Sequence, residues 1–182
     1  DGLSLSKGIN SQVGDRNSMP LFNLAWKSSF FWDGRAKSLR DQVLQPIQDH
    51  REMAAHLPSV IVHLEKNEGP AFERAFGPGE VTEEKIALAL ENFLLTLTSY
   101  DSKFDRAMSG KDKLTPAEER GMKLFFTEYE PRSQQYGADC FHCHGGANFS
   151  DHQLHNNGLG GDFATPSLRN LVLTAPYMHD GR

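Results

Sequence analysis

The sequence of 182 residues is poor in cysteine, in basic clusters and in long apolar segments. It has 2 cysteines, so a tetrahedral zinc site would have to be completed by histidines. Lysine and arginine together number 19 against 24 aspartates and glutamates, and they form no basic patch of the kind that binds nucleic acid. No apolar run approaches the length needed to cross a membrane. The composition therefore predicts neither a nucleic-acid partner nor a membrane span, while 38% hydrophobic residues are enough for a packed core.

The two cysteines lie close together, in the run Cys-Phe-His-Cys-His at 140–144. This run matches the C-x-x-C-H pattern that attaches c-type haem. Two thiols at this spacing can form thioethers to the two vinyl groups of one porphyrin, and the adjacent imidazole then lies under the iron. The pattern predicts Cys140 and Cys143 as covalent attachment sites and His144 as an axial ligand of the haem iron.

A redox-active cysteine pair and half of a zinc site are the other interpretations of this run. A thioredoxin-like pair is expected near a strand-helix-strand unit, and nothing before Cys140 has the pattern of a parallel strand. Zinc would need His152 and His155, which follow in a stretch rich in glycine and asparagine. Haem is favoured over both. Because c-type haem is usually attached on the far side of a membrane, the run also predicts an exported chain, either mature or trimmed.

Residues 1–35 contain turn-forming residues and predict irregular structure, whereas helical spacing dominates afterwards. One helix is expected behind the cap residue Ser38. The clearest begins at the cap Thr82 and carries apolar residues on one face as far as Leu97.

Two further helices are expected. One should start at Pro58 and end at the pair Gly69-Pro70. The other opens with a capping box formed by Thr115 and Glu118. No pair of segments alternates convincingly between polar and apolar residues, so the predicted fold class is mainly α.

The polar stretch 109–113 predicts a boundary between two domains. The first domain is expected to cover residues 1–109 and the second residues 110–182. In the second, Gly121 and Phe125 share one helix face shortly before the haem motif, which is the order of elements in a small cytochrome c domain.

Four separated stretches resemble the bacterial di-haem cytochrome c peroxidase family, which includes the MauG-like enzymes. They are Arg-Asn-Ser at 16–18, the stretch 31–53 that begins Phe-Trp-Asp-Gly-Arg, the haem motif at 140–145, and the stretch 165–182 that ends Met-His-Asp-Gly-Arg. They occur in the family's usual order and span nearly the whole chain. Several motifs in order are more specific than one haem motif, so the chain is identified as a member of this family.

The resemblance implies two cytochrome c-like domains with two c-type haems, and a periplasmic enzyme that reduces hydrogen peroxide to water. Electrons would come from a small donor cytochrome or a cupredoxin. In the family the amino-terminal haem binds peroxide and the carboxy-terminal haem relays electrons, so the motif at 140–144 should hold the electron-entry haem. The family is often dimeric, which leaves a homodimer open.

Three residues of the stretch 31–53 match residues with roles in the family. Glu52 matches the distal acid-base residue, which moves the peroxide proton from the inner to the outer oxygen. Gln42 matches the amide that lines the same pocket. Trp32 matches the tryptophan between the two haems, whose ring shortens the electron's path. Without the resemblance, two surface polar residues and a core aromatic would be the simpler interpretation.

The resemblance also implies a calcium ion between the two domains. Asn17, Thr174 and Pro176 match its ligands, and the ion is held there by oxygen atoms, largely backbone carbonyls together with several waters. Without the resemblance, a turn asparagine and a loop free of metal would be preferred.

The chain departs from the family pattern in two respects. It has one haem motif where the family has two, and the family's sixth ligand to the carboxy-terminal iron lies beyond Arg182, so the intact protein is expected to extend past both ends. Met178 and His179 are therefore not assigned as that ligand. Ile9 lies where classical peroxidases have a histidine that blocks the peroxidatic iron. Because Ile9 cannot ligate iron, the active haem should have an open position when oxidised.

Two alternatives to the peroxidase stay open. Ile9 favours a MauG-like di-haem oxidase of a protein or small-molecule substrate. The single C-x-x-C-H motif leaves room for a monohaem electron-transfer cytochrome that retains peroxidase ancestry.

Overall fold

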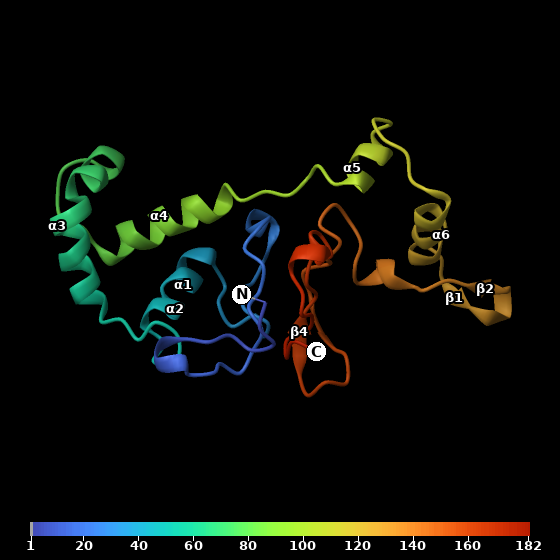
Figure 1. The fold of residues 1–182 in the computed structure, drawn as a ribbon, viewed down its shortest axis with the longest axis horizontal. Helices are drawn as coiled ribbons and strands as arrows, with labels where there is room; N and C mark the ends of the chain where they lie inside the picture. Colours follow the sequence, from blue (N-terminus) through green and yellow to red (C-terminus); the bar gives the residue numbers. More distant parts are fainter. Residues whose placement is uncertain (1) are drawn as a thin grey trace. The chain divides into compact units, whose positions relative to one another are not determined.

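The computed structural model describes residues 2–182, and the regular secondary structure of these residues is mainly helical, as predicted (Figure 1). They form two compact units. Unit 1 comprises the residues up to Leu97 together with Val172–Arg182, and unit 2 comprises Thr98–Leu171. The domains 1–109 and 110–182 expected from the sequence remain a prediction. No helix among the described residues is both long and apolar enough to span a bilayer.

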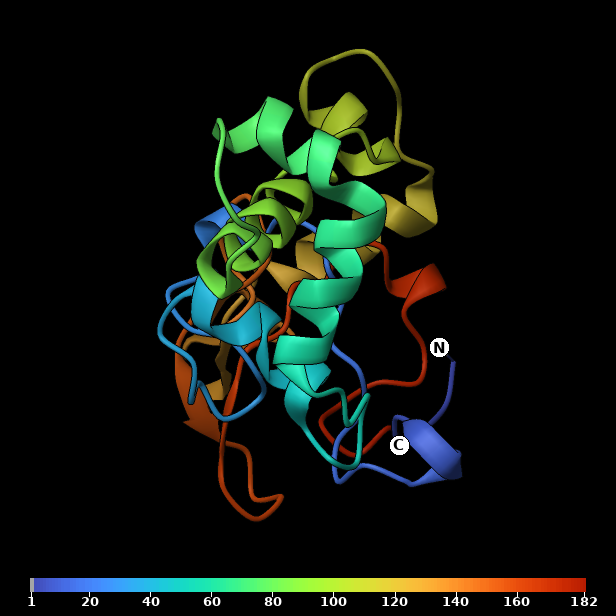
Figure 2. The ribbon, with the colours of Figure 1, turned by 90° about the vertical axis from the view of Figure 1, so that its left-hand side faces the viewer.

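Unit 1 contains four α-helices: α1 Leu39–Val43, α2 Gln45–Gln48, α3 Leu57–Phe76 and α4 Glu83–Leu95. Both α1 and α3 pack against α4 (Figure 1, Figure 2). The buried core beneath α1 and α4 consists of Leu24, Phe30, Ala36, Leu39, Val43 and Ala87. Burial of these side chains ties the loops before α1 to the helices, because each removes apolar surface from water.

Side-chain caps begin α1 and α4 of unit 1, where the sequence predicts them. The Ser38 hydroxyl accepts a hydrogen bond from the Asp41 N–H at 3.1 Å at the start of α1. The Thr82 hydroxyl accepts from the Lys85 N–H at 3.2 Å at the start of α4. Each bond satisfies an N–H that has no partner within its helix.

The predicted end of α3 at Gly69-Pro70 is wrong, because the helix continues through Pro70 to Phe76. Proline removes one hydrogen bond from the helix interior. The rings of Phe72 and Phe76, one turn apart, lie 5.8 Å from each other and support the last turn. The helix ends at Gly77, whose φ of 81° suits glycine.

Unit 2 contains α5 Lys103–Met108 and α6 Pro116–Phe125. The predicted capping box of α6 is confirmed. The Thr115 hydroxyl accepts from the Glu118 N–H at 3.3 Å, and the Glu118 carboxylate accepts from the Thr115 N–H at 2.6 Å.

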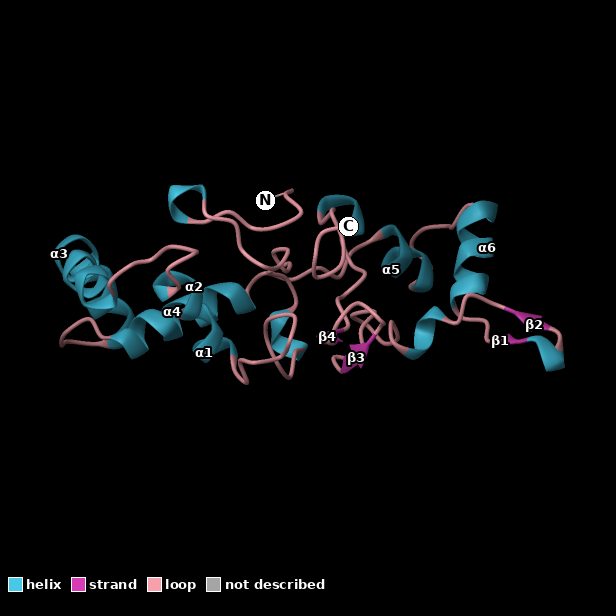
Figure 3. Cartoon of the chain, turned by 90° about the horizontal axis from the view of Figure 1, so that it is seen from below, coloured by secondary structure: helices cyan, strands magenta, loops and turns pink. Residues whose placement is uncertain are grey.

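Among residues 2–182, strands are confined to two short antiparallel ladders in unit 2 (Figure 3). They are β1 Tyr129–Glu130 with β2 Gln135–Tyr136, and β3 Leu154–Asn156 with β4 Asp162–Ala164. Runs of two or three residues are too short for alternation to be visible in a sequence. The haem motif lies between the ladders, on the 3-10 turn Cys140–His142.

Candidate functional site

In unit 2, the histidine predicted to ligate the haem iron is held in one tautomer. His144 Nδ1 lies 3.1 Å from the carbonyl oxygen of Phe149. A carbonyl can only accept, so this contact assigns the proton to Nδ1 and leaves the lone pair on Nε2. An imidazole whose Nδ1–H bonds a backbone carbonyl is a typical metal ligand.

The two motif cysteines are free thiols; Cys140 begins the 3-10 turn, and Cys143 follows it directly before His144. The His144 N–H donates to the Cys140 carbonyl at 2.9 Å, and the Asp151 N–H donates to the Cys143 carbonyl at 2.8 Å. These bonds hold both cysteines and the histidine in one compact turn.

An apolar cavity of about 310 Å³ lies between α5, α6 and the segment after the haem motif. Its walls are mostly hydrocarbon and include Phe104, Leu114, Met122, Phe125, Phe126 and Phe149. Gly121 also lines it, and a Cβ built on this glycine meets no atom within 4 Å. The predicted pair Gly121 and Phe125 thus faces open apolar space.

Free thiols, a correctly oriented imidazole and an adjoining apolar cavity fit c-type haem. Phe149 connects these parts, because its carbonyl binds the histidine and its ring lines the cavity. The donor set of Cys140, Cys143 and His144 is the one that the C-x-x-C-H pattern requires.

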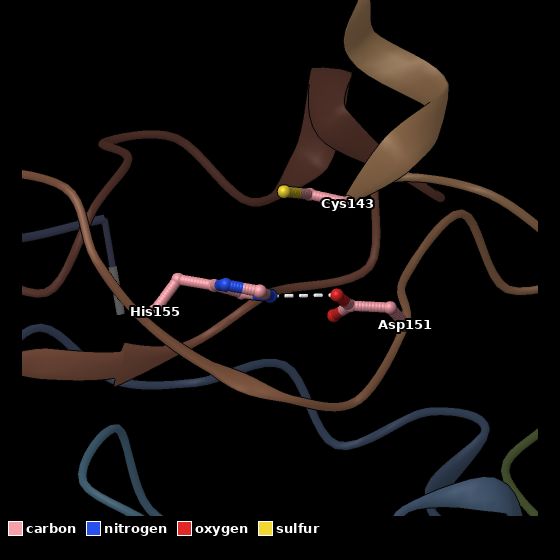
Figure 4. Close-up of side chains that lie close together, drawn as sticks. All are labelled: Cys143, Asp151 and His155. Carbon is pink, nitrogen blue, oxygen red and sulfur yellow. Dashed lines mark hydrogen bonds and ion pairs between the residues drawn. The ribbon is translucent and has the colours of Figure 1, made fainter.

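The alternative zinc interpretation also has a structural counterpart in unit 2. Figure 4 shows Cys143, Asp151 and His155, whose ligand atoms lie within 4.8 Å of one another. His155 Nε2 lies 2.6 Å from Asp151 Oδ2, while His152 is not part of the trio. The sulfur of Cys143 would be consumed in a haem thioether, so this trio could bind zinc fully only in a chain without haem.

A second, more polar cavity of about 490 Å³ lies in unit 1. Trp32, Gln42 and Glu52 all line it, although they come from a loop, from α1 and from the segment after α2. Lys27 lines the same cavity, and burial lowers the pKa of its ammonium to about 8. The structure therefore brings together the three residues for which the sequence predicts catalytic and relay roles.

Glu52 is half-buried in this cavity wall, and its pKa is raised above the usual value. Burial is the main cause, because it disfavours the charged form, and the Asp49 carboxylate adds to the effect. The guanidinium groups of Arg35 and Arg51 oppose it. A carboxyl with a raised pKa is suited to accept and return a proton near neutral pH.

The segment Gly8-Ile9 lies against the backbone of Glu52. The Ile9 N–H donates to the Glu52 carbonyl at 2.6 Å. A Cβ on Gly8 would lie 1.9 Å from the Arg51 carbonyl oxygen, so only glycine permits this approach. The Ile9 side chain is 42% exposed and offers no ligand atom.

Trp32 is 7% exposed and is held from two sides within unit 1. Its indole N–H donates to the Asn17 carbonyl at 2.8 Å. The buried His179 ring meets it edge-on, with 6.5 Å between ring centroids. The Trp-Asp-Gly-Arg loop that carries it is closed by the hydrogen bond from the Phe30 N–H to the Ala36 carbonyl.

Asn17 is buried in unit 1. Its side-chain nitrogen donates to the carbonyls of Leu3 and Ser4, at 2.8 and 3.2 Å. Thr174 and Pro176 are half-buried in the segment 172–182 of the same unit. The calcium ligand set stays a prediction.

Sequence reasoning missed one ion pair of unit 2 entirely. Arg169 donates to both carboxylate oxygens of Asp105, at 2.7 and 2.8 Å, and its Nε donates to the Ala147 carbonyl at 2.8 Å. Arg169 belongs to a stretch that carries the family resemblance, and this was the available signal. Nothing in the sequence distinguishes Asp105 from other acidic residues at helix starts.

Comparisons with known proteins found a matching family model and several similar proteins. The family model for di-haem cytochrome c peroxidases matches residues 1–113. The methylamine utilization protein MauG of Methylophilus methylotrophus is 33% identical over 202 residues, a match that covers 100% of this chain and 58% of that protein. The cytochrome c551 peroxidase of Nitrosomonas europaea is 32% identical over 206 residues, covering 100% and 59%. The chain thus spans less than two thirds of these relatives.

Solved structures agree on the fold. A MauG-like protein associated with microbial copper homeostasis superimposes with a TM-score of 0.86 at 26% identity, covering 100% of this chain and 63% of that one. The diheme peroxidase BthA from Burkholderia thailandensis gives a TM-score of 0.79 at 20% identity, covering 99% and 58%. At that identity the likeness concerns the fold alone.

Proposed function

Because the chain belongs to the di-haem cytochrome c peroxidase family, we propose that it carries the acid-base and electron-entry parts of a periplasmic peroxidase. This enzyme would reduce hydrogen peroxide to water with electrons from a small cytochrome or cupredoxin. The observation that carries the proposal is the cavity of unit 1, which Glu52, Gln42 and Trp32 all line.

Haem c is the cofactor of the family, and the residues of unit 2 fit it. Cys140 and Cys143 would hold it through thioethers, and His144 would face the iron through Nε2. The bound haem supplies an iron that exchanges single electrons. Its apolar surroundings in unit 2 would keep water away from the macrocycle.

Glu52 would manage the protons of peroxide reduction. As a carboxylate it takes the proton from the inner oxygen of the peroxide, and as an acid it returns that proton to the outer oxygen, which then leaves as water. Two electrons and two further protons complete the conversion of one peroxide into two waters. Because the pKa of Glu52 is raised, its ionised and protonated forms differ less in free energy near neutral pH.

Gln42 and Trp32 would assist without changing protonation state. The Gln42 amide can hold the peroxide by a hydrogen bond while Glu52 accepts its proton. We assign Trp32 as the electron relay, supported by its Trp-Asp-Gly-Arg context and by the contacts that fix its ring. Asn17, Thr174 and Pro176 are proposed to bind calcium.

The substitution Glu52→Gln tests the acid-base assignment. It keeps the size of the side chain but removes the proton acceptor, so peroxide turnover should fall by roughly 10²- to 10⁴-fold. Turnover should be measured in the intact protein with both haems, and the haem content checked by a pyridine haemochrome spectrum. Glu68→Gln, at an exposed position of α3, is the matched control and should leave turnover unchanged. Equal turnover of the two variants would refute the role of Glu52.

A MauG-like oxidase of a protein or small-molecule substrate is the second candidate, and Ile9 favours it. This side chain has no ligand atom, and its backbone is tied to Glu52. The oxidised intact protein should therefore contain one haem with an open coordination position. Electron paramagnetic resonance should detect a high-spin ferric signal, whereas two fully low-spin haems would contradict this expectation.

A further inference from the structure

An ion pair in unit 2 connects α5 to the segment that follows the second ladder. Arg169 and Asp105 form two parallel hydrogen bonds, and their side chains are 8% and 22% exposed. Hydrogen bonds from Arg169 hold the pKa of the Asp105 carboxyl well below its usual range. A bidentate pair shielded from water fixes both side chains in one geometry.

The same arginine reaches the loop after the haem motif. Its Nε donates to the Ala147 carbonyl at 2.8 Å, and its guanidinium lies 5.5 Å from the centre of the Phe149 ring. Two hydroxyls support the same loop. Ser167 donates to the Asn148 carbonyl at 2.6 Å. Ser150 donates to the carbonyl of Thr165, four residues before Arg169, at 2.8 Å.

The loop 147–150 in turn determines where the proximal imidazole lies. The Phe149 carbonyl accepts from His144 Nδ1, so any movement of this carbonyl rotates or frees the ring. The Phe149 ring is packed edge-on against Phe104 and Phe125, with centroids 5.4 and 6.1 Å away. An unbroken set of contacts therefore runs from Asp105 to His144.

We propose that the Asp105–Arg169 ion pair is a positioning element for the proximal ligand, which clamps the loop 147–150 and so keeps the Phe149 carbonyl on His144 Nδ1. The proposal rests on His144 as a haem ligand and does not depend on peroxidase activity. The hydrogen bond to Nδ1 makes the imidazole a stronger donor, and a stronger donor favours ferric over ferrous iron. Loss of the clamp should therefore raise the reduction potential of this haem.

The test uses the intact protein with both haems and the variants Asp105→Asn, Arg169→Gln and their combination. Removing a hydrogen-bond partner of a metal-ligating histidine typically weakens metal binding by roughly tenfold or more. A tenfold loss of preference for ferric iron corresponds to a rise of about 59 mV in a one-electron potential. The double variant should shift the reduction potential no further than the single variant with the larger shift, because both substitutions break the same ion pair.

Arg106→Gln is the matched control. Arg106 lies on the same helix and pairs with Asp112 at 3.2 Å, but it donates to no carbonyl of the loop 147–150. Its substitution should leave the potential of the carboxy-terminal haem and its low-spin resonance signal unchanged. If Arg169→Gln does not accumulate, the nearly isosteric Asp105→Asn carries the test alone.

If the Asp105 and Arg169 variants leave the reduction potential and the resonance signal of the carboxy-terminal haem unchanged, the positioning role of the ion pair is refuted. The haem assignment would stay intact. His144→Ala separates the two questions. If that change leaves the ligation of the carboxy-terminal haem unaltered, the haem assignment itself fails, and with it the premise of the clamp.

Discussion

Unit 2 takes the residues predicted to attach its haem from one short run, whereas unit 1 assembles its predicted acid-base residues from separate segments. The cavity of unit 2 is lined mainly by phenylalanine, leucine and methionine, whereas the cavity of unit 1 has many charged and amide groups among its apolar walls. A covalently attached group needs local spacing and dry walls. Proton transfer needs a carboxyl in a particular electrostatic environment, and that environment comes from residues distant in the sequence.

Two carboxyl groups show the same contrast in their pKa values. Burial and the neighbouring Asp49 carboxylate raise the pKa of Glu52, although Arg35 and Arg51 partly compensate. Hydrogen bonds from Arg169 outweigh burial at Asp105 and lower its pKa. A buried carboxyl is thus reactive or structural according to its partner.

The largest effect is expected from removing the attachment sites of unit 2. The double substitution Cys140→Ser with Cys143→Ser should eliminate one covalent haem, because serine cannot form the thioethers. Intact mass and a pyridine haemochrome spectrum measure this loss, and turnover with a protein electron donor should disappear. His142→Gln, between the two cysteines, should retain full haem content. An unchanged haem ratio in the double variant would show that the run at 140–144 does not attach haem.

A smaller effect is expected from the backbone of unit 1. Gly8→Ala places a Cβ 1.9 Å from the Arg51 carbonyl, so the backbone next to Glu52 must move. Displacement of a catalytic group by about 1 Å can cost roughly 10²-fold in rate, and peroxide turnover should fall by up to this amount. At Gly69, in the interior of α3, an added Cβ meets no atom within 4 Å, so Gly69→Ala should change turnover little. Similar rates for both variants would remove any role for the close approach.

The smallest effect concerns the pH dependence of turnover. Peroxide reduction needs Glu52 ionised to accept a proton, so kcat/KM should rise with pH through the pKa of Glu52, above the usual glutamate range. Asp49→Asn should move this acidic limb to lower pH, because it removes a neighbouring negative charge. Arg35→Gln should move it to higher pH, because it removes a positive one. Each shift should be below about one pH unit. Shifts in the same direction would contradict this account of the electrostatics.

Much of the local structure was predictable. The caps Ser38, Thr82 and Thr115 begin helices as expected, because capping depends on residues within one turn. The end of α3 was not predictable from Gly69-Pro70, since contacts beyond the proline continue the helix. The short ladders of unit 2 escaped prediction because their register depends on partners across a loop.

The C-x-x-C-H motif and the family membership could be recognised from the sequence, because both consist of residue types at defined spacing. The tertiary structure was needed to establish which groups surround them. It placed Glu52 beside Gln42 and Trp32 in one cavity, and it linked Asp105 through Arg169 and Phe149 to His144. The physical reason is that pKa values and ligand orientation depend on distances across space, which residue spacing along the chain does not encode.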